Sequence, residues 1–180
     1  MSTRSLISIQ REDDKYECIY CHSDGYLTYN GAMLLDHYSD KEKVEKLLKL
    51  GNLSLLERKI EPNPDSPHSF DYDKRQEDVV VAYGRDRGET NQESKIFTFD
   101  EMMDYGWIEY IYILDKNNNW KYLKPPNREL KDVKKDLEKE YKSMKIKRPK
   151  DYYGFWSEQR LIEERKKQKK QKRHKSEGEM

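Results

Sequence analysis

The stretch CIYCHSDGY, residues 18–26, reads as a strand that ends in a polar turn at Asp24 and Gly25. A second apolar run, SLISI at residues 5–9, is separated from it by the charged segment REDDK at residues 11–15. Two short runs of this kind around a polar linker predict an antiparallel hairpin. We therefore expect the fold to be organised around this hairpin.

A distant stretch, VVVAYGRDRGE at residues 79–89, follows the same plan. Its valines run without alternation, which predicts a buried strand over residues 78–83. Loops at strand ends often carry binding and catalytic residues. The polar turns after the two strands are therefore candidate parts of one site.

Local signals predict the other elements. Helices are expected over residues 32–38 and 41–50, with a further helical turn over residues 53–56. Ser39 or Asp40 can cap the second helix, and Gly51 can end it.

Further along the chain, Thr98 and Glu101 match a capping box that opens a short helix. Residues 107–114 and 120–123 predict a hairpin.

Asn127 is expected to cap an amphipathic helix with one apolar stripe, which docks on the sheet or on a partner. The stripe consists of Leu130, Val133, Leu137, Tyr141 and Met144. The predicted fold class is α+β, with a small, mainly antiparallel sheet flanked by short helices and a C-terminal helical basic extension.

The composition indicates one compact domain with an extension. Of the 180 residues, 34% are hydrophobic and 39% are charged, so the core must be small, with the 14 tyrosines supplying much of its apolar area. We expect an α+β core domain over residues 1–124, an amphipathic helix over residues 125–148, and a partly disordered tail over residues 149–180.

The tail differs from the body in charge. Residues 145–180 hold 13 Lys or Arg and 6 Asp or Glu, so the tail is at +7 while the chain as a whole is at +1. Its densest part has eight basic residues in eleven positions: Arg165, Lys166, Lys167, Lys169, Lys170, Lys172, Arg173 and Lys175. Two interpretations stay open, a solvated and partly disordered run or a salt-dependent contact with nucleic-acid phosphates. The preceding aromatic residues could stack on bases or anchor the tail: Tyr152, Tyr153, Phe155 and Trp156.

Cys18, Cys21 and His22 match the spacing of a c-type haem attachment site, and a CxxC pair also suggests zinc or redox chemistry. Haem attachment requires export, and a structural zinc site needs further ligand pairs that this sequence lacks. In a strand, Cys18 and Cys21 would also point to opposite faces. We expect structural, reduced cysteines, with no metal and no cofactor.

The polar turns offer a candidate site with two interpretations. If the strand continued, Asp24 could hold the His22 imidazole in one tautomer for acid or base chemistry; otherwise the two belong to a hydrogen-bonded turn. Likewise, Arg85 and Arg87 could grip a phosphate or be satisfied by neighbouring acids. The candidate binding residues are Tyr20, His22, Asp24, Tyr26, Arg85, Arg87 and Glu89. The candidates for catalysis are His22, Asp24 and Asp86.

Several motifs occur in a fixed order: MSTR at residues 1–4, YCH at 20–22, DGY at 24–26, a helix ending at Leu50 and Gly51, and AYGRDRGE at 82–89. Together they resemble a family of small, largely uncharacterised proteins of bacteria, phages and other mobile elements, over roughly residues 1–123. Members often have Trp and Pro where this chain has Ser23 and Leu27. The resemblance implies a mobile-element context and carries no activity with it.

Two functions are therefore expected. The preferred one is a non-enzymatic accessory or host-modulating protein, with a possible counter-defence role, that binds a host protein or nucleic acid. The alternative is a small enzyme that acts on a phosphate-bearing substrate through His22, Asp24, Arg85 and Arg87. No apolar run reaches the roughly 18 residues of a membrane span, and no signal peptide is apparent, so we expect no membrane partner and a cytoplasmic location in a bacterial host.

Overall fold

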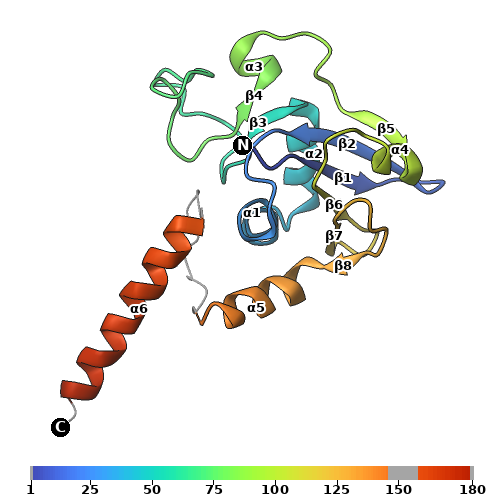
Figure 1. Ribbon diagram of the computed structural model, residues 1–180. Helices are drawn as coiled ribbons and strands as arrows, with labels where there is room; N and C mark the ends of the chain where they lie inside the picture. The colour runs from blue at the N-terminus through green and yellow to red at the C-terminus, as the bar shows by residue number, and fades with distance from the viewer. Residues whose placement is uncertain (1, 146–157, 179–180) are drawn as a thin grey trace.

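The computed structural model describes residues 2–145 and 158–178 and has the expected α+β fold (Figure 1). One eight-stranded mixed sheet, mostly antiparallel, has the order β4-β3-β2-β1-β6-β7-β8, and β5 also pairs with β2. The strands are β1 Ser5–Gln10, β2 Lys15–Cys21, β3 Leu53–Leu55, β4 Val81–Ala82, β5 Lys95–Thr98, β6 Tyr110–Leu114, β7 Trp120–Leu123 and β8 Lys131–Asp132. The helices are the π-helical η1 Leu27–Gly31, α1 Ala32–His37, α2 Lys41–Leu50, α3 Tyr83–Arg87, α4 Phe99–Met103, α5 Val133–Ser143 and α6 Glu158–Gly178.

The hairpin of β1 and β2 lies at the centre of the sheet, which confirms the prediction from residues 5–21. Ile7 in β1 pairs with Ile19 in β2 on one side and with Tyr112 in β6 on the other. The β1–β6 pair is parallel, so the chain must cross over between these two strands. Beside β2 lie β5, through Tyr16 and its neighbours, and β3, through Cys21.

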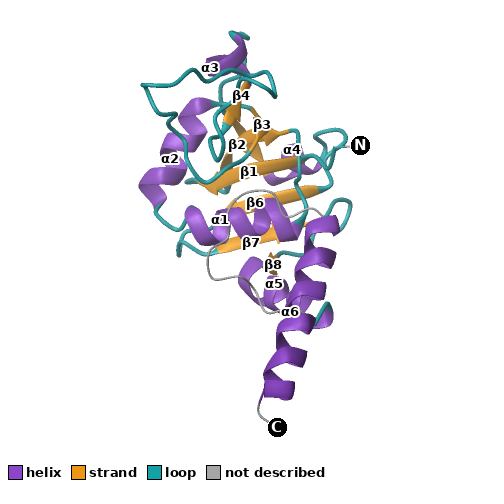
Figure 2. Ribbon diagram, turned by 90° about the vertical axis from the view of Figure 1, so that its left-hand side faces the viewer, coloured by secondary structure: helices purple, strands orange, loops and turns teal. Residues whose placement is uncertain are grey.

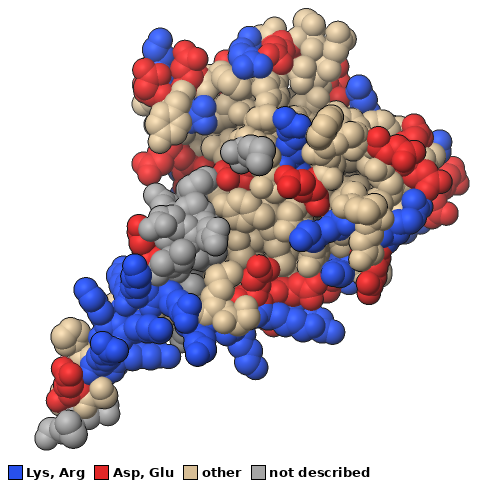
Figure 3. All heavy atoms as spheres, in the orientation of Figure 1, with Lys and Arg blue, Asp and Glu red and all other residues tan. Residues whose placement is uncertain are grey.

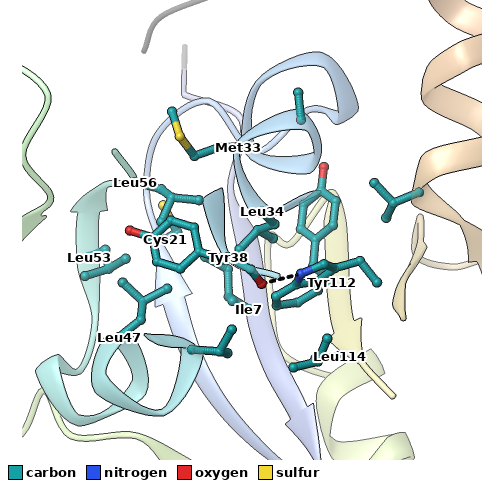
Figure 4. Packing of buried hydrophobic residues seen from close by; sticks show 14 of the residues in the cluster. Ile7, Cys21, Met33, Leu34, Tyr38, Leu47, Leu53, Leu56, Tyr112 and Leu114 are labelled. Atoms are coloured by element: carbon teal, nitrogen blue, oxygen red, sulfur yellow. Dashed lines mark hydrogen bonds between the residues drawn. The ribbon is translucent and has the colours of Figure 1, made fainter. Parts of the chain in front are cut away.

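Strand alternation divides the core into two faces. The helical face carries Ile7, Ile19 and Cys21, and helices α1, α2 and α5 contribute buried residues to the same cluster (Figure 4). The aromatic face carries Leu6 and Cys18 together with a smaller cluster to which α4 contributes. Cys18 and Cys21 therefore point to opposite faces, as a side-chain period of two requires.

Local signals gave several elements correctly. Asp40 caps α2 by accepting a hydrogen bond from the Glu42 amide at 3.0 Å. The predicted capping box of Thr98 and Glu101 is present in both directions at the start of α4. The hairpin of β6 and β7 is also formed as expected, with the Ile111–Leu123 pair at its open end.

Two predicted elements differ from the structure. Residues 53–56 were expected to be helical, but Leu53–Leu55 form β3, because Leu53 pairs with strands on both of its sides. The buried strand over residues 78–83 is reduced to Val81–Ala82 because Tyr83 begins α3. These elements are decided by long-range pairing, which local propensity does not report.

The amphipathic helix begins later than expected. Asn127 caps a turn by accepting a hydrogen bond from the Glu129 amide, whereas α5 starts at Val133 with Asp132 as its cap. The residues before Val133 form β8 instead. Most of the predicted apolar stripe docks within this protein, since Val133, Leu137 and Tyr141 are buried in the cluster of the helical face and Met144 packs against it. Leu130, the first predicted member, lies before α5 and is exposed.

Helix α6 extends away from the sheet in both ribbon views (Figures 1 and 2). Its 21 residues confirm the predicted helical basic extension. The predicted aromatic cluster at residues 152–156 lies outside the described residues. Within the described ranges, no helix combines the length and apolar character needed to cross a membrane.

Candidate functional site

Tyr20 and His22 form a hydrogen-bonded pair at the end of β2. The Tyr20 hydroxyl oxygen lies 2.8 Å from Nδ1 of His22. Burial raises the pKa of Tyr20 to about 12, whereas burial and the nearby charge of Arg4 lower the pKa of His22. At neutral pH, a protonated tyrosine therefore donates to Nδ1 of a neutral imidazole, and the ring proton stays on Nε2. The imidazole is oriented by Tyr20 and not by a carboxylate.

Asp24 belongs to a hydrogen-bonded turn beyond the strand. β2 ends at Cys21, and Asp24 has a φ of 55°, so the strand alternation that would align it with His22 is broken. The Gly25 amide donates to the Thr3 carbonyl at 2.8 Å. Burial raises the pKa of Asp24 to about 6. In the described residues, no hydrogen bond or ion pair joins the Asp24 and His22 side chains.

After this turn the chain becomes helical. Gly25 does not need a positive φ, but it has no room for a side chain, since an added Cβ would lie 2.8 Å from the Thr3 oxygen. The chain then winds directly through η1 into α1, and Tyr26 lies before it with its ring edge against Tyr29. Tyr26 is therefore part of the packing around the turn.

The Arg85 guanidinium group is occupied by its own protein. Arg85 donates to the main-chain oxygens of Ile60 at 2.6 Å and Val80 at 2.8 Å, and it pairs with both carboxylate oxygens of Asp86. Asp86 also accepts a hydrogen bond from the Ala82 amide at 2.8 Å. Burial works against ionisation of Asp86, but Arg85 and the Ala82 amide outweigh it and lower the pKa of Asp86. This set joins α3 to the preceding loop.

Arg87 is paired as well, at the surface. Its Nε donates to Oε1 of Glu89 at 2.6 Å, and its guanidinium group lies over the rings of Phe70 and Tyr83. Gly88, with a φ of 72°, ends α3 between the two charged residues. The predicted turn is therefore a short helix with a left-handed end, and its charges are paired locally.

The two polar segments leave the sheet in opposite directions. Cys21, Leu53 and Ala82 lie in register across β2, β3 and β4, which places the outer two about 10 Å apart. β3 runs parallel to β2 and antiparallel to β4. The chain therefore leaves β2 towards one end of the strands and leaves β4 towards the other end. In the part of the chain that the structure describes, no interaction joins His22 or Asp24 to Arg85 or Arg87.

A buried carboxyl that the sequence reading missed is Glu57. The Tyr29 hydroxyl donates to its Oε1 at 3.0 Å, and the Tyr38 hydroxyl donates to its main-chain oxygen at 2.6 Å. Burial raises the pKa of Glu57 to about 7, and the charges of Asp78 and Asp24 add to this. The available signal was an acid directly after the apolar run LSLL at residues 53–56. Asp24 is thus electrostatically coupled to Glu57, which follows the neighbouring strand.

The cysteines have no features of a reactive or metal-binding pair. Both thiols are free and buried, and burial raises the pKa of Cys18 to about 12 and that of Cys21 to about 11. Such thiols are protonated at neutral pH and are poor nucleophiles. Among the described residues, no group of three or more His, Cys, Asp or Glu side chains could hold a metal ion.

Helix α6 displays the basic residues of the tail. Arg165 is partly exposed, and the others are exposed: Lys166, Lys167, Lys169, Lys170, Lys172, Arg173 and Lys175. Figure 3 shows them as a concentrated blue surface, in contrast with the interspersed red and blue of the body. Several lie three or four residues apart, so like charges face each other along the helix. A surface of this kind attracts polyanions.

The chain was compared with family models, curated proteins and solved structures, and none of the three comparisons finds a match.

Proposed function

We propose that the protein is a non-enzymatic binding protein that contacts the phosphate backbone of nucleic acid through α6. The observation that carries this proposal is the exposed basic surface of that helix. Its eight Lys and Arg side chains lie within a helical segment about 15 Å long, since each residue adds 1.5 Å. Double-stranded DNA carries a comparable density of negative charge along its axis.

The rest of the chain favours a contact confined to this helix. Residues 145–180 are at +7, whereas the whole chain is at +1, so the body is acidic and would be repelled by phosphate. A basic helix on an acidic body presents only one element to the nucleic acid. Such binding is independent of base sequence, because phosphate contacts carry no sequence information.

The biological setting is part of the same proposal. The resemblance of the motifs at residues 1–4, 20–26 and 82–89 supports a factor of a phage or other mobile element that acts in the cytoplasm of a bacterial host. In that setting, contact with nucleic acid would modulate the host, including its defence. The enzyme alternative has less support, because Arg85 and Arg87 already have partners and His22 is paired with Tyr20.

The test is the salt dependence of binding to a labelled duplex of arbitrary sequence, followed by fluorescence anisotropy. About half of the α6 charges can face one duplex at a time, so about four phosphates would be neutralised. Binding should then weaken about 100-fold between roughly 50 and 200 mM salt. A second duplex of scrambled sequence should bind equally well.

Matched triple variants identify the element responsible. Replacing Lys166, Lys169 and Lys170 with Gln should weaken binding and reduce the salt slope. Replacing three exposed lysines of α2 with Gln removes the same charge from the body and should change little: Lys41, Lys46 and Lys49. Equal losses in both variants, or binding that does not respond to salt, would contradict the proposal. If the α6 variant instead loses binding only to an acidic protein, the helix is a protein-binding element.

A further inference from the structure

A hollow lies between β3 and the loop before β4. Its volume is about 460 Å³, and Leu55 and Val79 form part of its wall. This volume falls in the range of about 300–1,000 Å³ that is usual for small-molecule sites. Neither His22 nor Arg85 lines it, so it is separate from the residues that the sequence pointed to.

Glu57 brings an open hydrogen-bond acceptor to this hollow. The residue is only 8% exposed, and two buried tyrosines fix it through Oε1 and its main-chain oxygen. Its Oε2 atom is buried and has no hydrogen-bond partner among the described residues. Buried polar atoms are nearly always hydrogen-bonded in folded proteins, so this oxygen calls for a donor.

Arg75 brings an open donor to the same hollow. One of its terminal nitrogens donates to the Phe70 oxygen at 2.8 Å, and its guanidinium group lies over the exposed ring of Tyr72. Its Nε is buried without a hydrogen-bond partner in the described residues. Two residues that line the hollow, Glu57 and Arg75, thus each keep a buried polar atom without a hydrogen-bond partner in the described residues.

The charge of the lining favours a cation. Glu57, Glu77 and Asp78 contribute carboxyl groups, against the single guanidinium of Arg75. Asp78 is already paired with Arg58. A metal ion would need several convergent ligands, which the described residues do not provide. One open carboxylate oxygen instead suits a single N–H of an ammonium group.

We propose that the hollow binds a small protonated amine that also carries an oxygen acceptor, with its ammonium group on Oε2 of Glu57 and its oxygen on Nε of Arg75. The amino alcohols have this chemistry. The site is independent of the nucleic-acid contact proposed for α6, and either can hold without the other.

The raised pKa of Glu57, about 7, gives the proposal a distinct pH dependence. Only the ionised carboxylate attracts a cation, so affinity should fall as the pH drops through this value. Between about pH 8 and 5.5 the ionised fraction, and with it the affinity, should fall about 30-fold. The groups that act on Glu57 are Tyr29, Tyr38, Asp24, Arg75 and Asp78, and Asp24, which titrates near pH 6, adds to the effect.

The experiment is calorimetric titration of the full chain with three probes of equal carbon length: aminobutanol, butanediol and hydroxybutyrate. Aminobutanol should bind at about pH 8, and the neutral and anionic probes should not. Glu57→Gln should weaken aminobutanol binding at least about tenfold, whereas Glu42→Gln, an exposed residue of α2 that does not line the hollow, should change it less than about twofold.

Failure of aminobutanol to bind, equal binding of butanediol, or no effect of Glu57→Gln would overturn the proposal. If Glu57→Gln does not fold, the wild-type pH series decides, because a constant affinity between the two pH values contradicts a carboxylate acceptor. Arg75→Ala should weaken aminobutanol more than butylamine, which lacks the oxygen. Equal losses of affinity for both amines would show that Arg75 does not bind the oxygen of the ligand.

Discussion

Two main-chain carbonyls and one carboxylate surround the guanidinium group of Arg85. In the sequence, the same residue stands in a run of charges that resembles an anion-binding loop. Arg85 binds the main-chain carbonyls of Ile60 and Val80 instead of an anion, and the sequence alone does not show that these carbonyls lie beside it. A guanidinium fork fits such partners well, so Arg85 acts as a structural bridge.

Arg85→Ala should therefore reduce the free energy of unfolding by about 1–3 kcal/mol, because it leaves two carbonyls without a donor. Arg87→Ala is the matched control, since the Arg87 pair with Glu89 is at the surface and should cost less than about 1 kcal/mol. Urea denaturation of both variants measures the difference. Equal losses would mean that the carbonyl contacts of Arg85 contribute little.

Glu57 should make stability depend on pH. Its pKa is raised from 4.5 to about 7 in the folded state, so the folded protein holds this proton more tightly than the unfolded chain. The contribution of Glu57 to stability is then greatest below about pH 4.5 and falls as the pH rises towards 7, by about 3 kcal/mol at most. Glu57→Gln has no titrating group here and should lack this loss. Unfolding curves at several pH values, compared between the two proteins, test it; parallel profiles would contradict the shift.

The sequence identified part of the site at this scale. His22 and Asp24 could be singled out because they follow an apolar strand, and the pairing of Arg87 with Glu89 was one of two stated interpretations. The Tyr20 partner of His22 was accessible from the sequence, because residues two apart in a strand share a face. The buried position of Glu57 could not be found, because a charged residue in a charged sequence gives no sign of its depth.

At the scale of elements, local chemistry predicted the helix starts better than the strands. Asp40 and Thr98 cap their helices as expected, because a cap needs only residues within one turn. β3 was taken for a helical turn, and α5 was started too early at Asn127. β3 pairs with β2, which is distant in sequence, and the residues before α5 pair with the preceding strand β7; in both places pairing overrides the local preference.

Two glycines that end helices give a matched prediction. Gly51 has a φ of 85°, and an added Cβ would lie 2.2 Å from the Gln92 oxygen. Gly88 has a φ of 72° with nothing within 4 Å. Gly88→Ala should cost only the backbone strain of about 1–2 kcal/mol, whereas Gly51→Ala should cost about 2–5 kcal/mol because the main chain must also move. Chemical denaturation measures both, and similar costs would show that the loop at Gln92 yields easily.

At the scale of the whole molecule, the sheet unites segments from residue 5 to residue 132, whereas α6 stands apart (Figure 1). The α+β class followed from the alternation of short apolar runs and capped helices. The strand order did not, because nothing local specifies that β6 joins β1 in parallel. The basic extension was visible from charge alone.

Helix α6 should therefore melt separately from the body. Its like charges repel at three- and four-residue spacing, and salt screens this repulsion. On heating in low salt, the far-ultraviolet dichroism should lose helical signal before the near-ultraviolet signal of the buried aromatic core changes. Added salt should delay only the early phase. A single transition in both signals would show that α6 unfolds with the sheet.

The parallel pair of β1 and β6 also has a consequence for protein synthesis. Ser8 of β1 donates to the Tyr112 carbonyl, 104 residues later in the chain. At about 5–20 residues per second, the first hairpin leaves the ribosome about 5–20 seconds before its central partner has been made. During that interval the apolar edge of β1 is open to any other strand. The yield of folded protein would then depend more on early protection of this edge by a chaperone than on the stability of the finished sheet.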